Sequence, residues 1–397
     1  MYFRELILNE LDEVNNIYIY GYGIAGRWLY DNLPQKEKVR GFIDTDHKKS
    51  GLSQYGVDIS TPQSLKNVMP PDSIIINTVI DIQDVIDIVG RLRHRKALAL
   101  GLYLDDIDEL FHKNITGESD VFLQYSLSAV KSCHEGYFSK DKLFLRSVDL
   151  VITEKCSLKC KDCSNLMQYY DKPVDVAFSE VMADFNKLTE NLDGIFEVRL
   201  IGGEPFMNKD IYKILEYLYT KDNIIKIVIY SNAMIPIKQE YTHLIANDKL
   251  VFSLTDYGGL AKNTPKVVAQ LIELGAAYRL HPPENWTDSG EIGDFSRDAD
   301  GIQTIFENCC GKNLLTLSEG KLYRCPFSAN ADRLRAIPND PLNYVSAEAP
   351  PAQIRHFTRD IKFLPACNYC KGRSFDSPSI VPAVQALKPL SYIRFER

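Results

Sequence analysis

Three cysteines on one short stretch, Cys156, Cys160 and Cys163, are the residues with the clearest capacity for chemistry. They follow an apolar stretch, Val148–Thr153, that predicts a β-strand. Three thiolates on one loop can hold three irons of a cubane cluster and leave the fourth iron open, as a catalytic metal centre requires. A zinc knuckle is the alternative interpretation, but it needs a fourth Cys or His nearby, and only two histidines precede the next cysteine.

The other cysteines form a second group near the end of the sequence. Of the nine cysteines, Cys133 stands alone and is interpreted as a buried thiol. The remaining five are Cys309, Cys310, Cys325, Cys367 and Cys370. In a reducing compartment, clustered thiols bind metal or do chemistry more often than they form disulfides.

Polar motifs recur where the next predicted strands end. The strand Glu197–Ile201 runs into a Gly-Gly-Glu-Pro sequence, whose glycines would expose backbone groups to a close ligand and whose carboxylate could accept from an ammonium. Ser231 and Asn232 end the following strand. Ser253 and Asp256 lie at the end of the strand after that. Because barrel sites assemble at the C-terminal ends of parallel strands, we expect these groups to lie near the cysteine loop.

Together these motifs resemble the radical S-adenosylmethionine (SAM) superfamily, whose signature is C-x-x-x-C-x-x-C. The resemblance covers roughly residues 147–375 and implies a 4Fe-4S cluster, held by the three cysteines of the loop, that binds SAM. It assigns the Gly-Gly-Glu-Pro motif to the methionine amine of SAM. The cofactor-binding residues that it implies are Gly202, Gly203, Glu204, Pro205, Ser231, Asn232, Ser253 and Asp256. Asp162 departs from the family pattern, because relatives usually carry there an aromatic residue that contacts the adenine.

The resemblance also implies a reaction. The reduced cluster would donate an electron to SAM, which splits into methionine and a 5′-deoxyadenosyl radical, and this radical would take a hydrogen atom from the substrate. The electron would come from a flavodoxin- or ferredoxin-type donor. Epimerisation, dehydrogenation or a related rearrangement of a small molecule could follow.

The second cysteine group resembles the twitch or SPASM extension of many radical SAM enzymes. Leu314–Leu317 and Lys321–Tyr323 predict a hairpin, and Gly320 to Cys325 has the G-x-x-x-x-C spacing of that extension. The resemblance implies one auxiliary 4Fe-4S cluster, as in the shorter twitch form, and a structural zinc ion is the alternative. The expected ligands are Cys310, Cys325, Cys367 and Cys370. Cys309 either replaces Cys310 as ligand or acts catalytically by returning a hydrogen atom to a substrate radical.

A glycine-rich turn near the start predicts a nucleotide site. The predicted strand Asn16–Tyr22 runs into Gly21, Gly23 and Gly26, which have G-x-G-x-x-G spacing. Asp44 lies about 20 residues on, where a ribose-binding acid is expected. The stretch resembles the small Rossmann-like domains of sugar-modifying enzymes in surface-polysaccharide pathways. Its crevice would hold a nucleotide or nucleotide-sugar, and the alternative is a domain that only packs against the rest of the chain.

Alternating strands and helices predict an α/β fold throughout. The expected domains are a Rossmann-like parallel sheet (1–115), a helical connector (116–146), a radical SAM core built as a partial (β/α)6 barrel (147–300) and a small Fe-S extension of the twitch/SPASM type (301–397). In the first domain, strands are expected at Val39–Ile43, Ser73–Val79 and Ala97–Tyr103, and helices at Arg27–Leu33 and Asp84–Arg93. In the core, helices are expected at Phe178–Leu192, Ile211–Tyr219, Glu240–Ala246 and Lys266–Leu274.

Composition indicates a soluble globular protein, and we expect it in the cytoplasm. Apolar residues make up 45% and charged residues 25% of the chain, which is typical of globular proteins. The net charge of −7, without a block of Lys or Arg, does not suggest a nucleic-acid partner. No apolar run approaches the ~20 residues of a membrane span, and the opening MYFRELILNE lacks the apolar stretch of a signal peptide.

The first domain bears on the class of substrate. The Rossmann-like domain favours a small molecule, in particular a nucleotide-linked sugar. A radical SAM peptide maturase is the rival enzyme, and a catalytically inactive, metal-stabilised binding protein is the rival from another class. Trp286, Asp288 and Glu291, after the fifth strand of the core, either line the substrate pocket or are ordinary loop residues.

Overall fold

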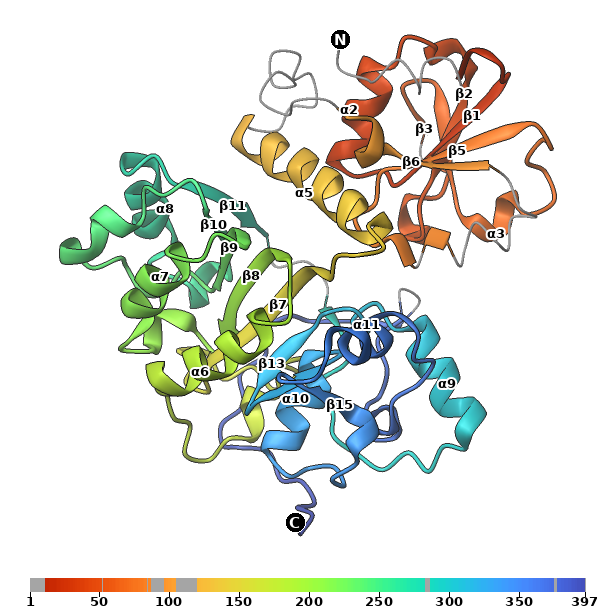
Figure 1. Ribbon diagram of the computed structural model, residues 1–397. Helices are drawn as coiled ribbons and strands as arrows, with labels where there is room; N and C mark the ends of the chain where they lie inside the picture. Colours follow the sequence, from red (N-terminus) through yellow and green to blue (C-terminus); the bar gives the residue numbers. More distant parts are fainter. Residues whose placement is uncertain are drawn as a thin grey trace. The chain divides into compact units, whose positions relative to one another are not determined.

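The computed structural model divides the chain into two compact units, Met1–Arg146 and Ser147–Arg397. It describes residues 11–51, 53–83, 85–86, 96–104, 120–282, 286–374 and 377–396. Both units are mixed α/β with parallel strands (Figure 1).

The first unit is built on a six-stranded sheet in the order β3-β4-β2-β1-β5-β6. The strands are β1 (Asn16–Tyr20), β2 (Val39–Ile43), β3 (Ser53–Gln54), β4 (Val57–Ser60), β5 (Ser73–Asn77) and β6 (Lys96–Ala99). All pairings are parallel except that of β3 with β4. Every residue of β5 is buried, as expected for a parallel strand covered on both faces.

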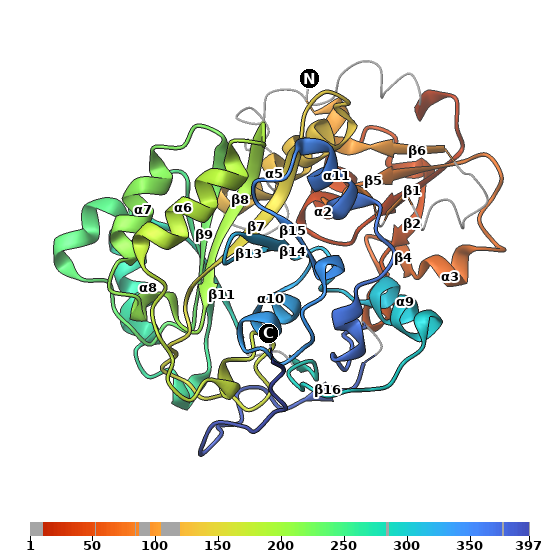
Figure 2. The same ribbon diagram turned by 60° about the horizontal axis from the view of Figure 1, so that its bottom comes forward.

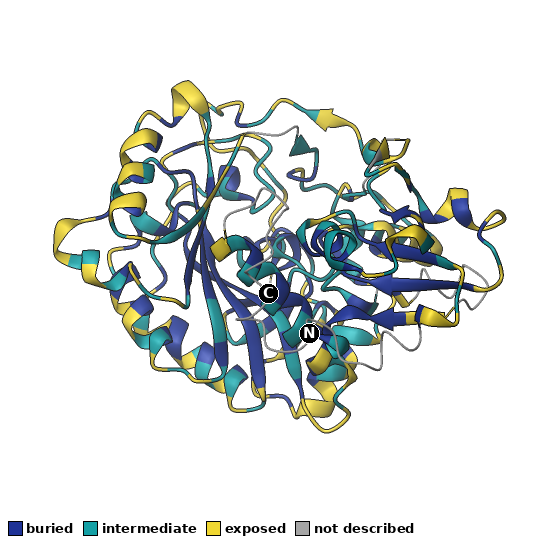
Figure 3. Ribbon diagram, turned by 90° about the horizontal axis from the view of Figure 1, so that it is seen from above, coloured by how far each residue is buried: buried dark blue, intermediate teal, exposed yellow. Residues whose placement is uncertain are grey.

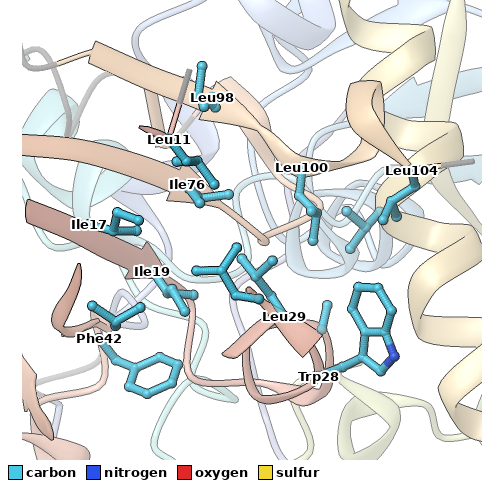
Figure 4. Packing of buried hydrophobic residues seen from close by; sticks show 14 of the residues in the cluster. Leu11, Ile17, Ile19, Trp28, Leu29, Phe42, Ile76, Leu98, Leu100 and Leu104 are labelled. Carbon is cyan, nitrogen blue, oxygen red and sulfur yellow. The ribbon is translucent and has the colours of Figure 1, made fainter. Parts of the chain in front are cut away.

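Helices α2 (Ile24–Asn32) and α5 (Asp120–Phe138) pack on this sheet, and α3 (Pro62–Leu65) is a single turn. Trp28 and Leu29 of α2 are fully buried with Ile19 and Phe42 of the sheet (Figure 4). Leu123, Leu127 and Val130 of α5 belong to the same hydrophobic cluster. Each such side chain contributes about 1.5–3 kcal/mol through burial, so α5 is an integral part of the first unit.

Two local expectations for this unit need comment. The expected strand Ala97–Tyr103 ends at Ala99, and Leu100–Tyr103 form a 3-10 helix. This 3-10 helix brings Gly101 against α5, and a Cβ on Gly101 would lie 2.4 Å from the Val130 carbonyl oxygen. Of the expected helix at Asp84–Arg93 only Val85 and Ile86 are described, and the rest lies outside the described residues.

The second unit contains an eight-stranded sheet in the order β11-β10-β9-β8-β7-β13-β14-β15. Its strands are β7 (Phe144–Thr153), β8 (Gly194–Gly202), β9 (Ile224–Ser231), β10 (Leu250–Thr255), β11 (Ala277–His281), β13 (Thr316–Ser318), β14 (Lys321–Tyr323) and β15 (Tyr344–Ser346). The strands β8 to β11 pair in parallel, β13 is parallel to β7, and β14 and β15 add antiparallel edges.

Helices α6 (Phe178–Thr189), α7 (Ile211–Tyr219) and α8 (Thr264–Glu273) lie on one side of strands β8 to β11 (Figure 2). The expected helix at Glu240–Ala246 is instead a 3-10 helix, η7 (Gln239–Leu244).

Figure 3 shows that the strands are buried and that the helices expose their outer faces. The last part of the unit holds α9 (Ala299–Asn308), α10 (Pro326–Arg333), α11 (Pro351–Arg359), the 3-10 turn η10 (Pro365–Asn368) and a short pairing of β12 (Trp286–Thr287) with β16 (Ser379–Ile380).

The hairpin β13–β14 turns where the sequence predicts it. Glu319 and Gly320 both have positive φ, 51° and 70°, which suits a tight two-residue hairpin turn. The Gly320 N–H donates to an Asp184 carboxylate oxygen of α6 at 2.7 Å and so fixes the hairpin to the parallel part of the sheet.

Among the described residues, none of the helices combines the length and the hydropathy that a transmembrane span requires.

His134 on α5 gives the first unit a pH-dependent stability. Its Nδ1 accepts from the Gly101 N–H at 2.9 Å, so its Nε2 donates to the Val79 carbonyl at 2.9 Å and the ring is neutral. Burial lowers the pKa of His134 from 6.5 to about 4. Between these values the unfolded chain binds more protons, so we expect this contribution of about 3 kcal/mol to be complete above about pH 6.5 and lost as the pH falls towards 4.

Urea unfolding followed by Trp28 fluorescence, in a Trp286→Phe background, measures this dependence. The slope of stability between pH 4.5 and 6.5 should flatten in His134→Gln and persist in the exposed control His47→Gln. Equal slopes in the two variants would contradict the assignment.

Candidate active site

The first cysteine group lies on the loop that follows β7, beside the end of β8. The Gly203 N–H donates to the Thr153 carbonyl at 2.9 Å and the Glu204 N–H to the Lys155 carbonyl at 2.8 Å. A Cβ on Gly203 would lie 2.1 Å from the Lys155 carbonyl oxygen and 2.9 Å from the Cys156 Cβ. The Gly-Gly sequence is therefore required for the two strand ends to approach one another.

Glu204 is fully buried and joins the ends of β8 and β9. Its Oε1 accepts from the Ser231 hydroxyl at 2.8 Å and from the Phe206 N–H at 3.3 Å, and its Oε2 accepts from the Asn232 N–H at 2.8 Å. Burial raises the pKa of Glu204 to about 7, and the hydrogen bonds limit that rise. The geometry thus gives Glu204 a positioning role, since the chain's own donors occupy the carboxylate that was expected to face a ligand.

Asn232 extends from the end of β9 to the cysteine loop. Its Nδ2 donates to the Ser157 hydroxyl at 3.0 Å and lies 3.8 Å from the Cys156 sulfur. Its Oδ1 accepts from the Met234 N–H at 3.1 Å. Among the expected cofactor residues, Asn232 is therefore placed directly against the sulfur group.

The end of β10 contributes a residue that the sequence did not single out, Tyr257. Burial is the main cause of the raised pKa of its hydroxyl, and the nearby cysteines of the loop raise it further. Its ring meets Trp286 edge to face, with centroids 6.0 Å apart. Asp256 makes a local turn, because its Oδ1 accepts from the Gly258 N–H at 2.8 Å, and Ser253 is half-buried in the strand. The only available signal for Tyr257 was an aromatic residue just after a strand end.

The three cysteines are half-buried and lie close together. Burial raises the pKa of Cys156 to about 12 and that of Cys160 to about 11, and neighbouring sulfurs add to both shifts. Burial also raises the pKa of Cys163. Thiolates would therefore be unfavourable here unless a cation compensated them, and soft, cationic iron does so.

Asp162, at the position where an aromatic was expected, pairs with Lys161 at 3.8 Å. The backbone beside Asp162 is closely packed, since a Cβ on Gly290 would lie 2.7 Å from the Asp162 carbonyl carbon. Gln168 joins the same two segments, because its Nε2 donates to the carbonyls of Cys163 at 3.2 Å and Gly290 at 2.8 Å. In the loop of Gly290, Asp288 and Glu291 both pair with Lys371, at 2.5 Å and 3.2 Å.

The second sulfur group differs from the expected set at one position. The pKa values of Cys367 and Cys370 are raised mainly by burial and then by other thiols, among them Cys325 and Cys309. Cys310 is exposed. The structure therefore gathers Cys309 with the other three cysteines and leaves Cys310 at the surface.

Backbone donors surround this second group. N–H groups of Gly311, Ser328 and Gly372 lie 3.3–3.4 Å from the sulfurs of Cys309, Cys325 and Cys370, respectively. Arg297 holds the peptide between two of the ligand candidates, since its guanidinium donates to the carbonyls of Cys367 at 2.6 Å and Cys370 at 2.8 Å.

One hydrophobic cluster joins the segment after the first cysteine loop to the second sulfur group. Leu166 and Tyr169, which follow Cys163 on the first loop, pack in the same cluster as Cys325 and Cys370. A second link is the nearly buried ion pair between Arg333 of α10 and Glu154 at the end of β7, with an N–O distance of 2.6 Å.

The donor sets fit iron–sulfur clusters. No three His, Cys, Asp or Glu side chains within the described ranges converge as ligands of one metal ion. The thiolates of a cubane bind different irons, so they do not need to converge on one point. Cys156, Cys160 and Cys163 would hold one cluster, and Cys309, Cys325, Cys367 and Cys370 a second.

In the first unit, the glycine-rich turn is tightly packed at two positions and open at a third. A Cβ on Gly26 would lie 1.9 Å from the Gly21 carbonyl oxygen, whereas one on Gly23 would meet no atom within 4 Å. Gly21 has φ +103°. The Asp44 carboxylate, expected to bind a ribose, accepts from the N–H groups of Tyr22 at 3.0 Å and Asp46 at 2.9 Å. It also pairs with Lys49 at 3.0 Å.

Comparison with known proteins finds a match for the central part of the chain. Residues 150–256 match the family described as the radical SAM superfamily. No curated protein matches the chain in sequence.

Solved structures show partial similarity. Streptococcus suis SuiB bound to S-adenosylmethionine has 19% identity and a TM-score of 0.30, over 45% of this chain and 43% of that one. BtrN in complex with AdoMet and 2-DOIA has 14% identity and a TM-score of 0.39, over 57% and 93%. Native anSMEcpe with bound AdoMet has 11% identity and a TM-score of 0.36, over 55% and 82%. The match thus spans less than half of the SuiB chain.

The placement of Cys309 and Cys310 leads to a direct test by metal analysis of anaerobically purified protein. We expect Cys309→Ala to lose metal from the second group, since this thiol is gathered with the other three. The matched control Cys310→Ala should retain the wild-type metal content, because its thiol is exposed. Full metal content in Cys309→Ala would contradict the assignment and would favour a hydrogen-donor role for this thiol.

Proposed function

We propose, for a chain whose residues 150–256 match the radical SAM superfamily, that this protein is a radical SAM enzyme acting on a small molecule. The observation that carries the proposal is the group of three half-buried, neighbouring cysteines that follows β7, beside the ends of β8 and β9. When bound, a 4Fe-4S cluster there would supply the electron that cleaves SAM to methionine and a 5′-deoxyadenosyl radical.

The chain's own residues would orient this chemistry. Gly202 and Gly203 present backbone close to the cysteine loop, and Glu204 fixes Asn232 beside it. Tyr257 lies near the thiols and is backed by Trp286, so this pair supplies an aromatic surface that Asp162 does not. We infer that Asn232 and Tyr257 contact SAM, with Glu204 acting through Asn232.

We infer that the second sulfur group holds an auxiliary cluster. Its four thiols and the three N–H groups beside them suit an Fe-S cluster better than an exposed metal site. Cys325 and Cys370 of this group pack in one hydrophobic cluster with Leu166 and Tyr169 of the first loop, which supports an auxiliary cluster near that loop. In a dehydrogenation, the substrate radical would lose one electron to this auxiliary cluster and one proton to solvent.

The substrate class is inferred from the first unit. Gly23 precedes α2, and no atom lies within 4 Å of the place that a Cβ would take there. This space suits a diphosphate that approaches the N–H groups at the start of the helix. These features support a nucleotide-linked sugar as the substrate, and a Rossmann-like role for this unit.

The test is formation of 5′-deoxyadenosine by the anaerobic, dithionite-reduced protein incubated with SAM. We expect product from the wild type, a higher rate with nucleoside diphosphate sugars, and only background product from Cys160→Ala. Cys133→Ala is the matched control, because this cysteine lies in the first unit, outside both sulfur groups.

Three outcomes would overturn parts of this proposal. Stimulation by peptides but not by nucleotide-sugars would favour a peptide maturase. Product formation in Cys160→Ala at the wild-type rate would remove the assigned cluster site. Zinc as the only bound metal, without 5′-deoxyadenosine, would favour an inactive binding protein.

A further inference from the structure

Residues 379–395, here called the strap, cross the first cysteine loop. The strap begins at β16, which pairs with β12 through Trp286–Ile380 and Thr287–Ser379. Farther along, it forms an isolated antiparallel bridge between Gln385 and Cys160. These two segments are 225 residues apart in sequence, so the contact is a feature of the tertiary fold.

Backbone hydrogen bonds fix the strap to both sides of Cys160. The Lys161 N–H donates to the Val384 carbonyl at 2.8 Å, and the Ala386 N–H donates to the Lys159 carbonyl at 2.5 Å. The strap thus pairs with the loop as a short edge strand would.

The side chain of Gln385 contacts the sulfur itself. Its Nε2 donates to the Cys160 sulfur at 3.5 Å and to the Ala383 carbonyl at 2.7 Å. Its Oε1 accepts from the Lys159 N–H at 2.7 Å. Because the amide oxygen is fixed by a backbone donor, the amide N–H is oriented towards the sulfur.

Contacts beyond the bridge hold the strap in place. The Leu390 N–H donates to the Gln168 carbonyl at 2.9 Å, and the Tyr392 hydroxyl donates to the Leu334 carbonyl at 3.1 Å. The Tyr392 ring meets Tyr169 edge to face at 5.7 Å. Between the bridge and these contacts, Leu387 is fully exposed.

We propose that Gln385 is a positioning residue that tunes the reduction potential of the cluster on Cys156, Cys160 and Cys163 by donating an N–H hydrogen bond to Cys160. Reduction adds one electron and therefore negative charge to the cluster and its thiolates. A hydrogen bond to sulfur stabilises that added charge and makes reduction easier. This proposal rests on the proposed function, because it requires the cluster.

The test is a redox titration of the full chain, followed by EPR of the cluster whose signal changes when SAM is added. Gln385→Leu keeps the approximate size and removes the N–H donor. We expect the ratio of reduced to oxidised cluster at a given potential to fall about threefold to tenfold, a tenfold fall corresponding to a shift of about 59 mV for one electron. Iron content should be unchanged.

Two further variants separate the hydrogen bond from the strap as a whole. Gln385→Glu replaces the donor by an anionic oxygen and should lower the potential at least as far as Gln385→Leu. The matched control Leu387→Gln changes an exposed strap residue that does not reach the loop and should keep the wild-type potential.

The outcomes distinguish this inference from the proposed function. Wild-type potential in Gln385→Leu, with the SAM-responsive signal present, would overturn the role of Gln385 and leave the enzyme assignment intact. A wild-type protein without any SAM-responsive cluster would overturn both. An equal shift in Leu387→Gln would assign the effect to strap disorder and so contradict the specific hydrogen bond.

Discussion

The close approach of β7 and β8 at their C-terminal ends is the constraint on which the rest of the site depends. Gly203 lies so near to Lys155 and Cys156 that any side chain would collide with backbone. This approach lets Glu204 turn inward, where it is completely buried and fastens Asn232 at the end of β9. Asn232 in turn contacts the cysteine loop, so three strand ends are joined by backbone and carboxylate hydrogen bonds before any cofactor is considered.

Burial explains why the cysteines are better suited to metal than to free thiol chemistry. In both groups burial is the largest cause of the raised thiol pKa values, which disfavours thiolates without a compensating cation. The surrounding N–H donors, from Gln385 at the first group and from backbone at the second, are the partners that an anionic cluster needs. One hydrophobic cluster and the Arg333–Glu154 ion pair then connect the segments that carry the two groups.

The sequence predicts local features well and long-range contacts poorly. Spacing identified the first cysteine loop, and apolar patterning located β7 and β8 to within a few residues, because both depend on neighbours along the chain. Adjacent Cys309 and Cys310 could not be distinguished in this way. Cys309 caps α9, and the helix end determines which thiol turns inward. The contact between Gln385 and Cys160 joins distant segments, and no local pattern encodes it.

The most direct test of the account is the iron content of anaerobically reconstituted protein, measured with a variant that lacks all three thiols of the first loop. Two cubanes predict about eight irons per chain in the wild type and about four in the variant Cys156→Ala/Cys160→Ala/Cys163→Ala. A wild type that binds zinc instead of iron, or a triple variant that keeps its full iron content, would contradict the central claim that this loop holds a catalytic iron–sulfur cluster.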